Sequence, residues 1–209
     1  MECTGHEMQQ DHNAEDALKT NFDPPSQSRE LIVEEIHGDE DPLLITIVER
    51  AEALRAAAVD GRHDADIEAL VELVNTPWHD EGSVGQRRRE HLGQISILLS
   101  DQICRDALIW LISDDRIEFS HAAHWLTEVT IKAPPAYRPG PATVLATMRW
   151  LQGDGVRAVA ACERALDSDP DYLLARLLLT GLRAGLPPQM WREVVGSLSW
   201  EECRGKSDE

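Results

Sequence analysis

The sequence predicts an all-α fold, a compact array of helices. Apolar residues recur at spacings of three, four and seven in several segments, which is the pattern of helices that bury one face. Proline and acidic residues separate these segments, as expected where helices begin and end. With 209 residues and 42% apolar side chains, the chain is long and apolar enough to form a core.

Residues 1–28 combine charged and polar residues with the pair Pro24-Pro25 and few apolar side chains. Burial in such a segment cannot offset the entropy lost on ordering, so we predict a disordered acidic tail. The helical domain is then expected to span residues 29–200, with a sub-boundary near residues 76–83 left open. Residues 201–209 are expected to fray at the C-terminus.

Two helices are expected between residues 29 and 61. The apolar run from Leu31 to Ile36 fits a short strand or a helical turn, and we favour a short helix. Asp41-Pro42 has the form of a cap followed by a proline in the first turn, so it begins the second helix. The inward face of that helix comprises Leu44, Ile47, Val48, Ala51 and Leu54.

Further helices are predicted over residues 66–74, from Ser83 onward, over residues 101–112 and over residues 120–131. Ser83 and Gln86 form a capping-box pattern, and Ser120 is expected to cap the last of these helices. Three arginines at 87–89 follow Ser83. Because Glu90 and an acidic loop adjoin them, we expect an ion-paired or solvated face rather than a phosphate site.

Residues 141–185 are expected to form three consecutive helices. Asp154 lies between two glycines and can cap the middle helix, which Asp169-Pro170 ends. Ala158, Cys162 and Ala165 share one face, and their small side chains allow a neighbouring helix to approach closely. The sequence therefore predicts a buried packing face here.

A last helix is predicted over residues 187–200. Its apolar residues Trp191, Val194, Val195 and Leu198 follow a helical spacing. We expect them to cap the helical stack.

Part of the 141–185 segment resembles the second half of a tetratricopeptide repeat. The resemblance is carried by Gly153-Asp154, Ala158, Ala165-Leu166 and Asp169-Pro170. Only one copy is present, whereas about three repeats are needed to bury a continuous core. We therefore predict tetratricopeptide-like helix packing in the C-terminal half of a globular domain.

A second resemblance covers more of the chain. The sequence is similar to an actinobacterial family known as domain of unknown function 4192, in its C-terminal part, over about residues 64–200. It does not extend into residues 1–63. The matching words are RDAL at 105–108, WLQGDG at 150–155, ERAL at 163–166, DPDY at 169–172 and LARLL at 174–178. The resemblance implies a helical fold and an actinobacterial or actinophage origin, and it supplies no catalytic residue.

The net charge of −18 is concentrated in the first part of the chain. Residues 1–81 hold 21 Asp and Glu against five Lys and Arg, and the remaining residues hold 17 against 15. Such a field repels nucleic-acid phosphate and anionic membranes and attracts basic partners, although acidity also serves solubility alone. The densest acidic cluster has no Lys or Arg within it and is our candidate docking surface: Glu34, Glu35, Asp39, Glu40 and Asp41.

The sequence contains no recognised catalytic motif. It has no GxSxG, phosphate loop or dinucleotide fingerprint, so we assign no catalytic residue and no cofactor. His121 and His124 lie one helical turn apart, a spacing that metal sites use, with Glu118 and Glu128 in reach. An HxxH pair without the glutamate of HExxH is more typical of surface or core histidines, so the two are only candidate metal ligands.

Cysteine spacing and hydropathy suggest a location. The four cysteines are widely spaced, as in reduced proteins of the cytoplasm. No apolar run approaches the length of about 18 residues that a membrane span needs. We therefore expect a cytoplasmic protein that does not enter a membrane.

The favoured function is a non-catalytic helical protein-interaction module with an acidic N-terminal half. One alternative is a small-molecule-binding protein or enzyme with a dispersed site around His121 and His124, and a lesser one is an acidic inhibitor that mimics nucleic acid. We expect a protein partner and no direct binding of nucleic acid, while the oligomeric state stays open. A groove without converging titratable groups would favour the first function, and a closed pocket holding both histidines and acids would favour the second.

Overall fold

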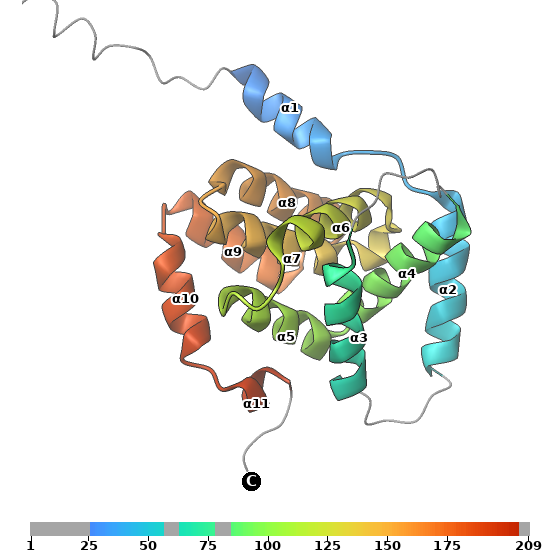
Figure 1. Ribbon diagram of the computed structural model, residues 1–209. Coiled ribbons are helices and arrows are strands. Elements are labelled where there is room, and N and C mark those ends of the chain that lie inside the picture. The colour runs from blue at the N-terminus through green and yellow to red at the C-terminus, as the bar shows by residue number, and fades with distance from the viewer. Residues whose placement is uncertain (1–25, 57–62, 78–84, 205–209) are drawn as a thin grey trace, which may run out of the picture.

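The computed structural model describes residues 26–56, 63–77 and 85–204, which form eleven α helices, one short 3-10 helix and no strand (Figure 1). The predicted all-α fold is confirmed. The helices are α1 Ser26–Ile36, α2 Pro42–Ala56, α3 His63–Asn75, α4 Gln86–Ser100, α5 Gln102–Ser113, α6 Phe119–Lys132, η1 Pro135–Tyr137, α7 Pro139–Leu151, α8 Gly155–Ser168, α9 Leu173–Arg183, α10 Pro188–Gly196 and α11 Trp200–Cys203.

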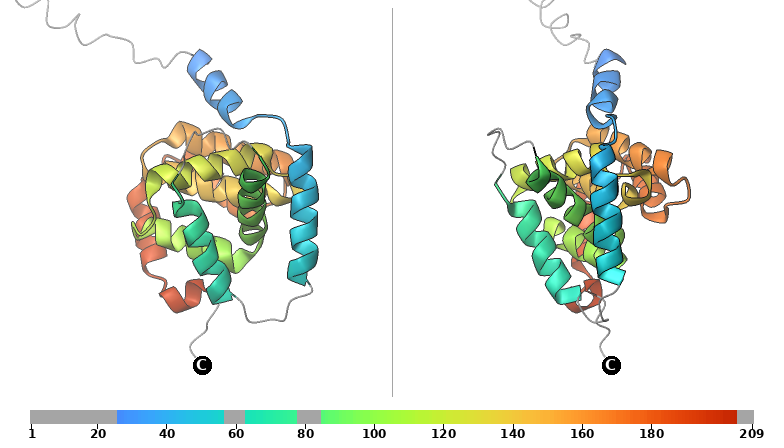
Figure 2. Two further views of the ribbon diagram at one scale, coloured as in Figure 1. Left: turned by 45° about the vertical axis from the view of Figure 1, so that its right-hand side comes forward. Right: turned by 90° about the vertical axis from the view of Figure 1, so that its right-hand side faces the viewer.

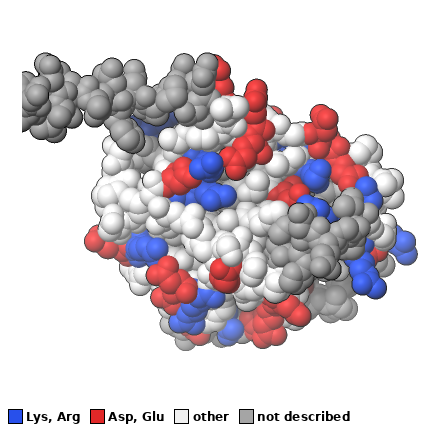
Figure 3. Space-filling model, turned by 45° about the horizontal axis from the view of Figure 1, so that its top comes forward, with Lys and Arg blue, Asp and Glu red and all other residues white. Residues whose placement is uncertain are grey.

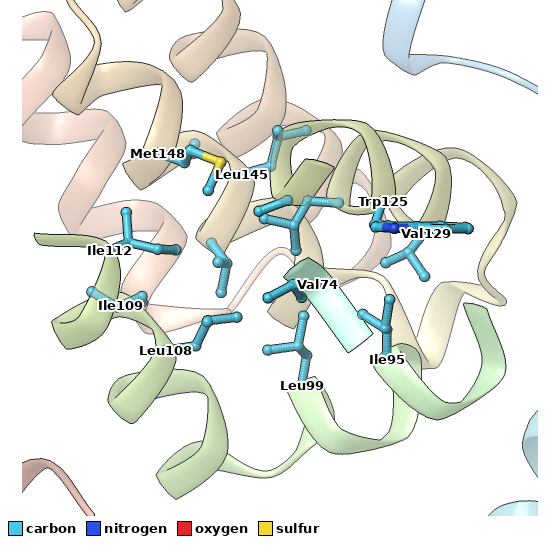
Figure 4. Close-up of a cluster of buried hydrophobic side chains, with 14 of the residues drawn as sticks. Val74, Ile95, Leu99, Leu108, Ile109, Ile112, Trp125, Val129, Leu145 and Met148 are labelled. Carbon is cyan, nitrogen blue, oxygen red and sulfur yellow. The ribbon is translucent and has the colours of Figure 1, made fainter. Parts of the chain in front are cut away.

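Helix α7 lies at the centre of the array. It is buried from Pro139 to Met148 and contacts α4, α5, α6, α8 and α9. Its sequence has no charged residue before Arg149, as is typical of a helix buried on all sides. Figure 4 shows Leu145 and Met148 of α7 in the core cluster that α4, α5 and α6 complete.

Two buried threonines of α7 satisfy their hydroxyls within the helix. Thr143 Oγ1 donates to the carbonyl oxygens of Pro139 and Gly140 at 2.9 and 2.8 Å, and Thr147 Oγ1 donates to that of Thr143 at 3.0 Å. These bonds remove the cost of burying unpaired polar groups. Both buried hydroxyl groups are therefore hydrogen-bonded.

The three helices predicted over residues 141–185 are present as α7, α8 and α9. The Asp154 carboxylate accepts a hydrogen bond from the Arg157 N–H at 3.1 Å and so caps α8, as predicted. Ala158, Cys162 and Ala165 are fully buried. The predicted small-residue packing face is confirmed.

Helix α7 also approaches α4 very closely at Gly140. A Cβ atom at this position would collide with the backbone carbonyl of Leu99, the penultimate residue of α4. Because a backbone carbonyl cannot rotate out of the way, only glycine fits without a shift of one helix. Gly140 thus sets how closely the two helices pack.

Helix α1 and the segment that joins it to α2 form what we call the N-terminal strap, residues 26–41. Figures 1 and 2 show α1 at the edge of the array, where it contacts α8 and α6. Ile36 is buried, and Ile32 and Val33 pack against the core. The short helix favoured for this run is confirmed. It begins at Ser26, so it includes three residues of the predicted tail, while residues 1–25 lie outside the described residues.

Helix capping follows the prediction at Asp41 and departs from it at α6 and α4. The Asp41 carboxylate accepts from the Leu43 N–H at 3.0 Å at the start of α2. At α6 the cap is Glu118 and not Ser120, because the longer Glu118 side chain accepts from the N–H groups of Ser120 and His121 at 3.2 and 2.8 Å. Gly85 is the N-cap of α4, where Ser83, which lies outside the described residues, was expected.

The prediction of a single C-terminal helix over residues 187–200 is wrong in its extent. The chain forms α10, breaks after Gly196, and begins α11 at a capping box between Ser199 and Glu202. Val195 is buried, but Val194 is 62% and Leu198 44% exposed. These two side chains therefore do not cap the stack.

Candidate functional site

Three of the five residues in the predicted acidic docking cluster form ion pairs within the chain. Their partners are arginines of the helical body: Glu35 pairs with Arg157 at 3.0 Å, Glu40 with Arg138 at 3.2 Å and Asp41 with Arg89 at 2.7 Å. Among the described residues, Glu34 and Asp39 form no ion pair. On the face shown in Figure 3, basic side chains lie beside acidic ones. The cluster therefore fastens the N-terminal strap to the body.

Asp41 combines two roles in this strap. Burial by itself raises the pKa of its carboxyl, but the hydrogen bonds from Arg89 and from the Leu43 N–H outweigh that effect and leave the pKa below its ordinary value. The charged carboxylate is thus the form that stabilises the fold. It both caps α2 and holds α4 through Arg89.

The Arg138 guanidinium is the buried partner of the strap. It is 3% exposed and donates to the Ala133 carbonyl at 2.7 Å, to the Ser168 hydroxyl at 3.1 Å and to Glu40. Two more contacts join the strap to α8: Arg29 lies 3.4 Å from Glu163, and His37 lies 3.2 Å from Asp167. Polar contacts thus hold the strap along its whole described length.

A groove runs along one face of α6, and we call it the α6 groove. Its volume is about 590 Å³. It is lined by Glu35, Glu118, Phe119, Ser120, Ala123, His124, Thr127, Glu128, Ile131, Arg149 and Gln152. Titratable groups from α1, α6 and α7 therefore converge on it.

The two candidate metal ligands are not brought together in this groove. His124 lines it, whereas His121 does not and has its Nε2 3.8 Å from a Glu118 carboxylate oxygen. Within residues 26–56, 63–77 and 85–204, no three His, Cys, Asp or Glu side chains are arranged to hold a metal ion. Of the two candidate metal ligands, the groove therefore contains only His124.

A second candidate site is apolar and lies on α9, α10 and the segments next to them. We call it the α9–α10 surface, and its members are exposed large apolar side chains: Leu173, Leu177, Leu186, Met190, Val194 and Leu198. They make up six of the nine such side chains among the described residues. The sequence signal that was missed is the run LLARLLL, which holds more leucines than one buried helix face can use.

A hollow of about 400 Å³ adjoins this surface between α5, α9, α10 and α11. Ile103, Ile109, Leu174, Trp191 and Val195 supply its apolar lining. Leu198 belongs both to the hollow and to the α9–α10 surface. Through Leu198, the α9–α10 surface therefore adjoins a concave site with a largely apolar lining.

Two of the described cysteines, Cys104 and Cys162, are unsuited to act as nucleophiles. Cys104 and Cys162 are buried free thiols, and burial raises the pKa of each to about 12. Thiolates are therefore scarce near neutral pH at both positions.

In the part of the chain that the structure describes, no helix combines the length and apolarity that a bilayer span needs.

Comparison with known proteins gives one match. A family model described as "Domain of unknown function (DUF4192)" matches residues 4–189. The chain belongs to this family. The match begins about 60 residues earlier than the resemblance over residues 64–200 indicated, so the strap and α2 are part of the family domain, and it ends within α10. Neither a search of curated proteins nor one of solved structures found a match.

Proposed function

We propose that this member of the DUF4192 family is a non-catalytic helical module that binds a protein partner through the α9–α10 surface. The observation that carries the proposal is the gathering of exposed apolar side chains at residues 173–198, with Leu173 67%, Leu177 60% and Val194 62% exposed. Single exposed leucines need no explanation, but six exposed large apolar side chains within residues 173–198 favour an interaction site.

The neighbouring hollow supports the same proposal. Binding energy at protein interfaces concentrates in a few apolar or aromatic side chains that fill pockets on the partner. The hollow beside Trp191 offers such a pocket next to the patch. An apolar anchor residue of the partner would fill it while the surrounding leucines exclude water.

Charge influences the rate at which the partner encounters the protein. The net charge of −18 favours encounter with a basic protein and disfavours nucleic acid, as do Glu34 and Asp39, which form no ion pair with the residues that the structure describes. We also propose tetratricopeptide-like packing of α7 to α9, which the buried Ala158 and Ala165 support. We further propose a cytoplasmic location, which the free thiols of Cys104 and Cys162 support.

The test compares two matched double variants in affinity capture with crosslinking from cells that express the chain. Leu173→Ser with Leu177→Ser removes the α9 part of the surface. Leu31→Ser with Leu43→Ser removes two leucines that are 65% and 58% exposed elsewhere. We expect the wild type and the control to recover the same partner and the α9 variant to lose it; equal recovery by all three would refute the proposal.

A further inference from the structure

The α6 groove follows one side of a single helix. Ser120, Ala123, Thr127 and Ile131 are spaced by three or four residues, so they share a face of α6. Arg149 and Gln152, at the end of α7, and Glu35 of α1 complete the lining. The groove therefore combines an apolar strip on α6 with polar groups from two other helices.

The three carboxylates of the groove are already engaged. Glu35 is paired with Arg157 at 3.0 Å, and Glu128 accepts from Arg88 Nε at 2.6 Å. Glu118 caps its own helix, and the hydrogen bond from the His121 N–H, followed by those from Ser120, lowers the pKa of that carboxyl. Each of the three carboxylates thus already has partners within the chain.

Arg149 differs from the other charged groups of the groove. Its side chain forms no ion pair and no hydrogen bond with any of the residues that the structure describes, and it is half-buried in the last turn of α7. A guanidinium has five N–H donors in a plane, which match the two oxygens of a carboxylate. Arg149 is the one Arg or Lys in the groove lining, and since none of the described carboxylates pairs with it, it is suited to bind a carboxylate of a ligand.

The other residues that line the groove indicate the chemistry of the ligand apart from its carboxylate. Phe119, Ala123 and Ile131 give the groove apolar walls. Three glutamates in the lining and the net charge of −18 disfavour a ligand with several negative charges. A volume of about 590 Å³ lies within the usual range of small-molecule sites.

We propose that the α6 groove binds a monocarboxylate with a short apolar body. Arg149 holds the carboxylate, Gln152 lies beside it as a second polar contact, and the apolar body lies along α6. Both a free organic acid and the C-terminal carboxylate of a peptide have this chemistry. The site is separate from the α9–α10 surface, and the inference does not rest on the proposed function.

The experiment is an NMR titration of the full chain with four probes, of which hexyl phosphate tests for a phosphate site. Hexanoate represents the free acid, N-acetyl-alanyl-leucine represents a peptide C-terminus, and hexanamide has the apolar body without the charge. We expect saturable shifts at the amides of Ala123 and Thr127 with one or both acids and none with hexanamide. The acid with the lower Kd identifies the source of the ligand.

Variants of the arginine make the test specific. Arg149→Gln should weaken binding of the preferred acid about ten- to a hundredfold, since a hydrogen bond to a charged group is lost. Arg176→Gln removes an arginine that is 60% exposed on α9 and should leave the Kd unchanged. The inference is overturned if neither acid saturates, if hexanamide binds equally well, if Arg149→Gln binds as the wild type does, or if hexyl phosphate binds more tightly than hexanoate.

Discussion

Replacement of Gly140 by alanine tests the closest helix contact in the array. The new Cβ atom would collide with the Leu99 carbonyl, and since that atom belongs to the α4 backbone, α4 or α7 must move. Overpacking of this kind costs about 1–3 kcal/mol, and a collision with backbone lies at the upper end. Alanine regains about 1 kcal/mol as a better helix former than glycine. The expected net loss of stability is therefore about 2 kcal/mol.

Urea unfolding followed by circular dichroism measures this loss directly, and for a chain of this size it corresponds to a Tm lower by about 4–8 °C. Gly155→Ala is the matched control, because Gly155 also lies in the first turn of a helix and a Cβ there meets nothing within 4 Å. That variant should be as stable as the wild type or more stable by about 0.4–1 kcal/mol. If both variants had the same stability, the close approach of α4 and α7 would be wrong.

Other predictions concern the strap, the small-residue face and the thiols. Asp41→Asn keeps a capping side chain but loses the ion pair with Arg89, so it should cost about 1 kcal/mol at pH 7. Because the pKa of Asp41 is lowered in the native state, this contribution is complete above the unfolded pKa of about 3.9 and disappears as pH falls through the native value. In urea titrations, the stability difference between wild type and Asp41→Asn should therefore be smaller at pH 3 than at pH 7. Ala158→Trp should overpack the contact between α8 and its neighbours and lower the free energy of unfolding by about 1–3 kcal/mol or more. An unchanged Tm would contradict the buried face. Iodoacetamide at pH 8 should leave Cys104 and Cys162 unmodified in the native protein and alkylate both in urea, as mass spectrometry of peptides would show.

The elements that sequence predicted well are those with strong local signals. Asp41 and Asp154 cap the helices that they were expected to cap, because the cap and the apolar period after it lie within one segment. Ala158 and Cys162 are buried as expected, since their spacing alone places them on one face. Ser120 fits the cap pattern of α6 equally well by residue type, but the longer Glu118 side chain reaches the free N–H groups.

The candidate sites were harder to predict because they depend on distant parts of the chain. Glu35 pairs with Arg157, which lies 122 residues away in the sequence, so no local pattern predicts the contact. Arg149 could not be identified as the unpaired cation of a groove without knowledge of which acids pair elsewhere. The exposure of Leu173 and Leu177 likewise depends on which side of α9 packs on α8.

The buried guanidinium of Arg138 bears on how the N-terminal part of the chain opens. It joins the end of α6, the end of α8 and the strap through Ala133, Ser168 and Glu40. Detachment of the strap removes the carboxylate from a charge that is only 3% exposed, and an uncompensated buried charge is strongly unfavourable. Water must then reach Arg138, which requires the last turn of α8 to loosen at the same time. We therefore expect the amide hydrogens of the strap and of that turn to exchange as one cooperative unit, so that local unfolding at the edge of the array extends toward its interior.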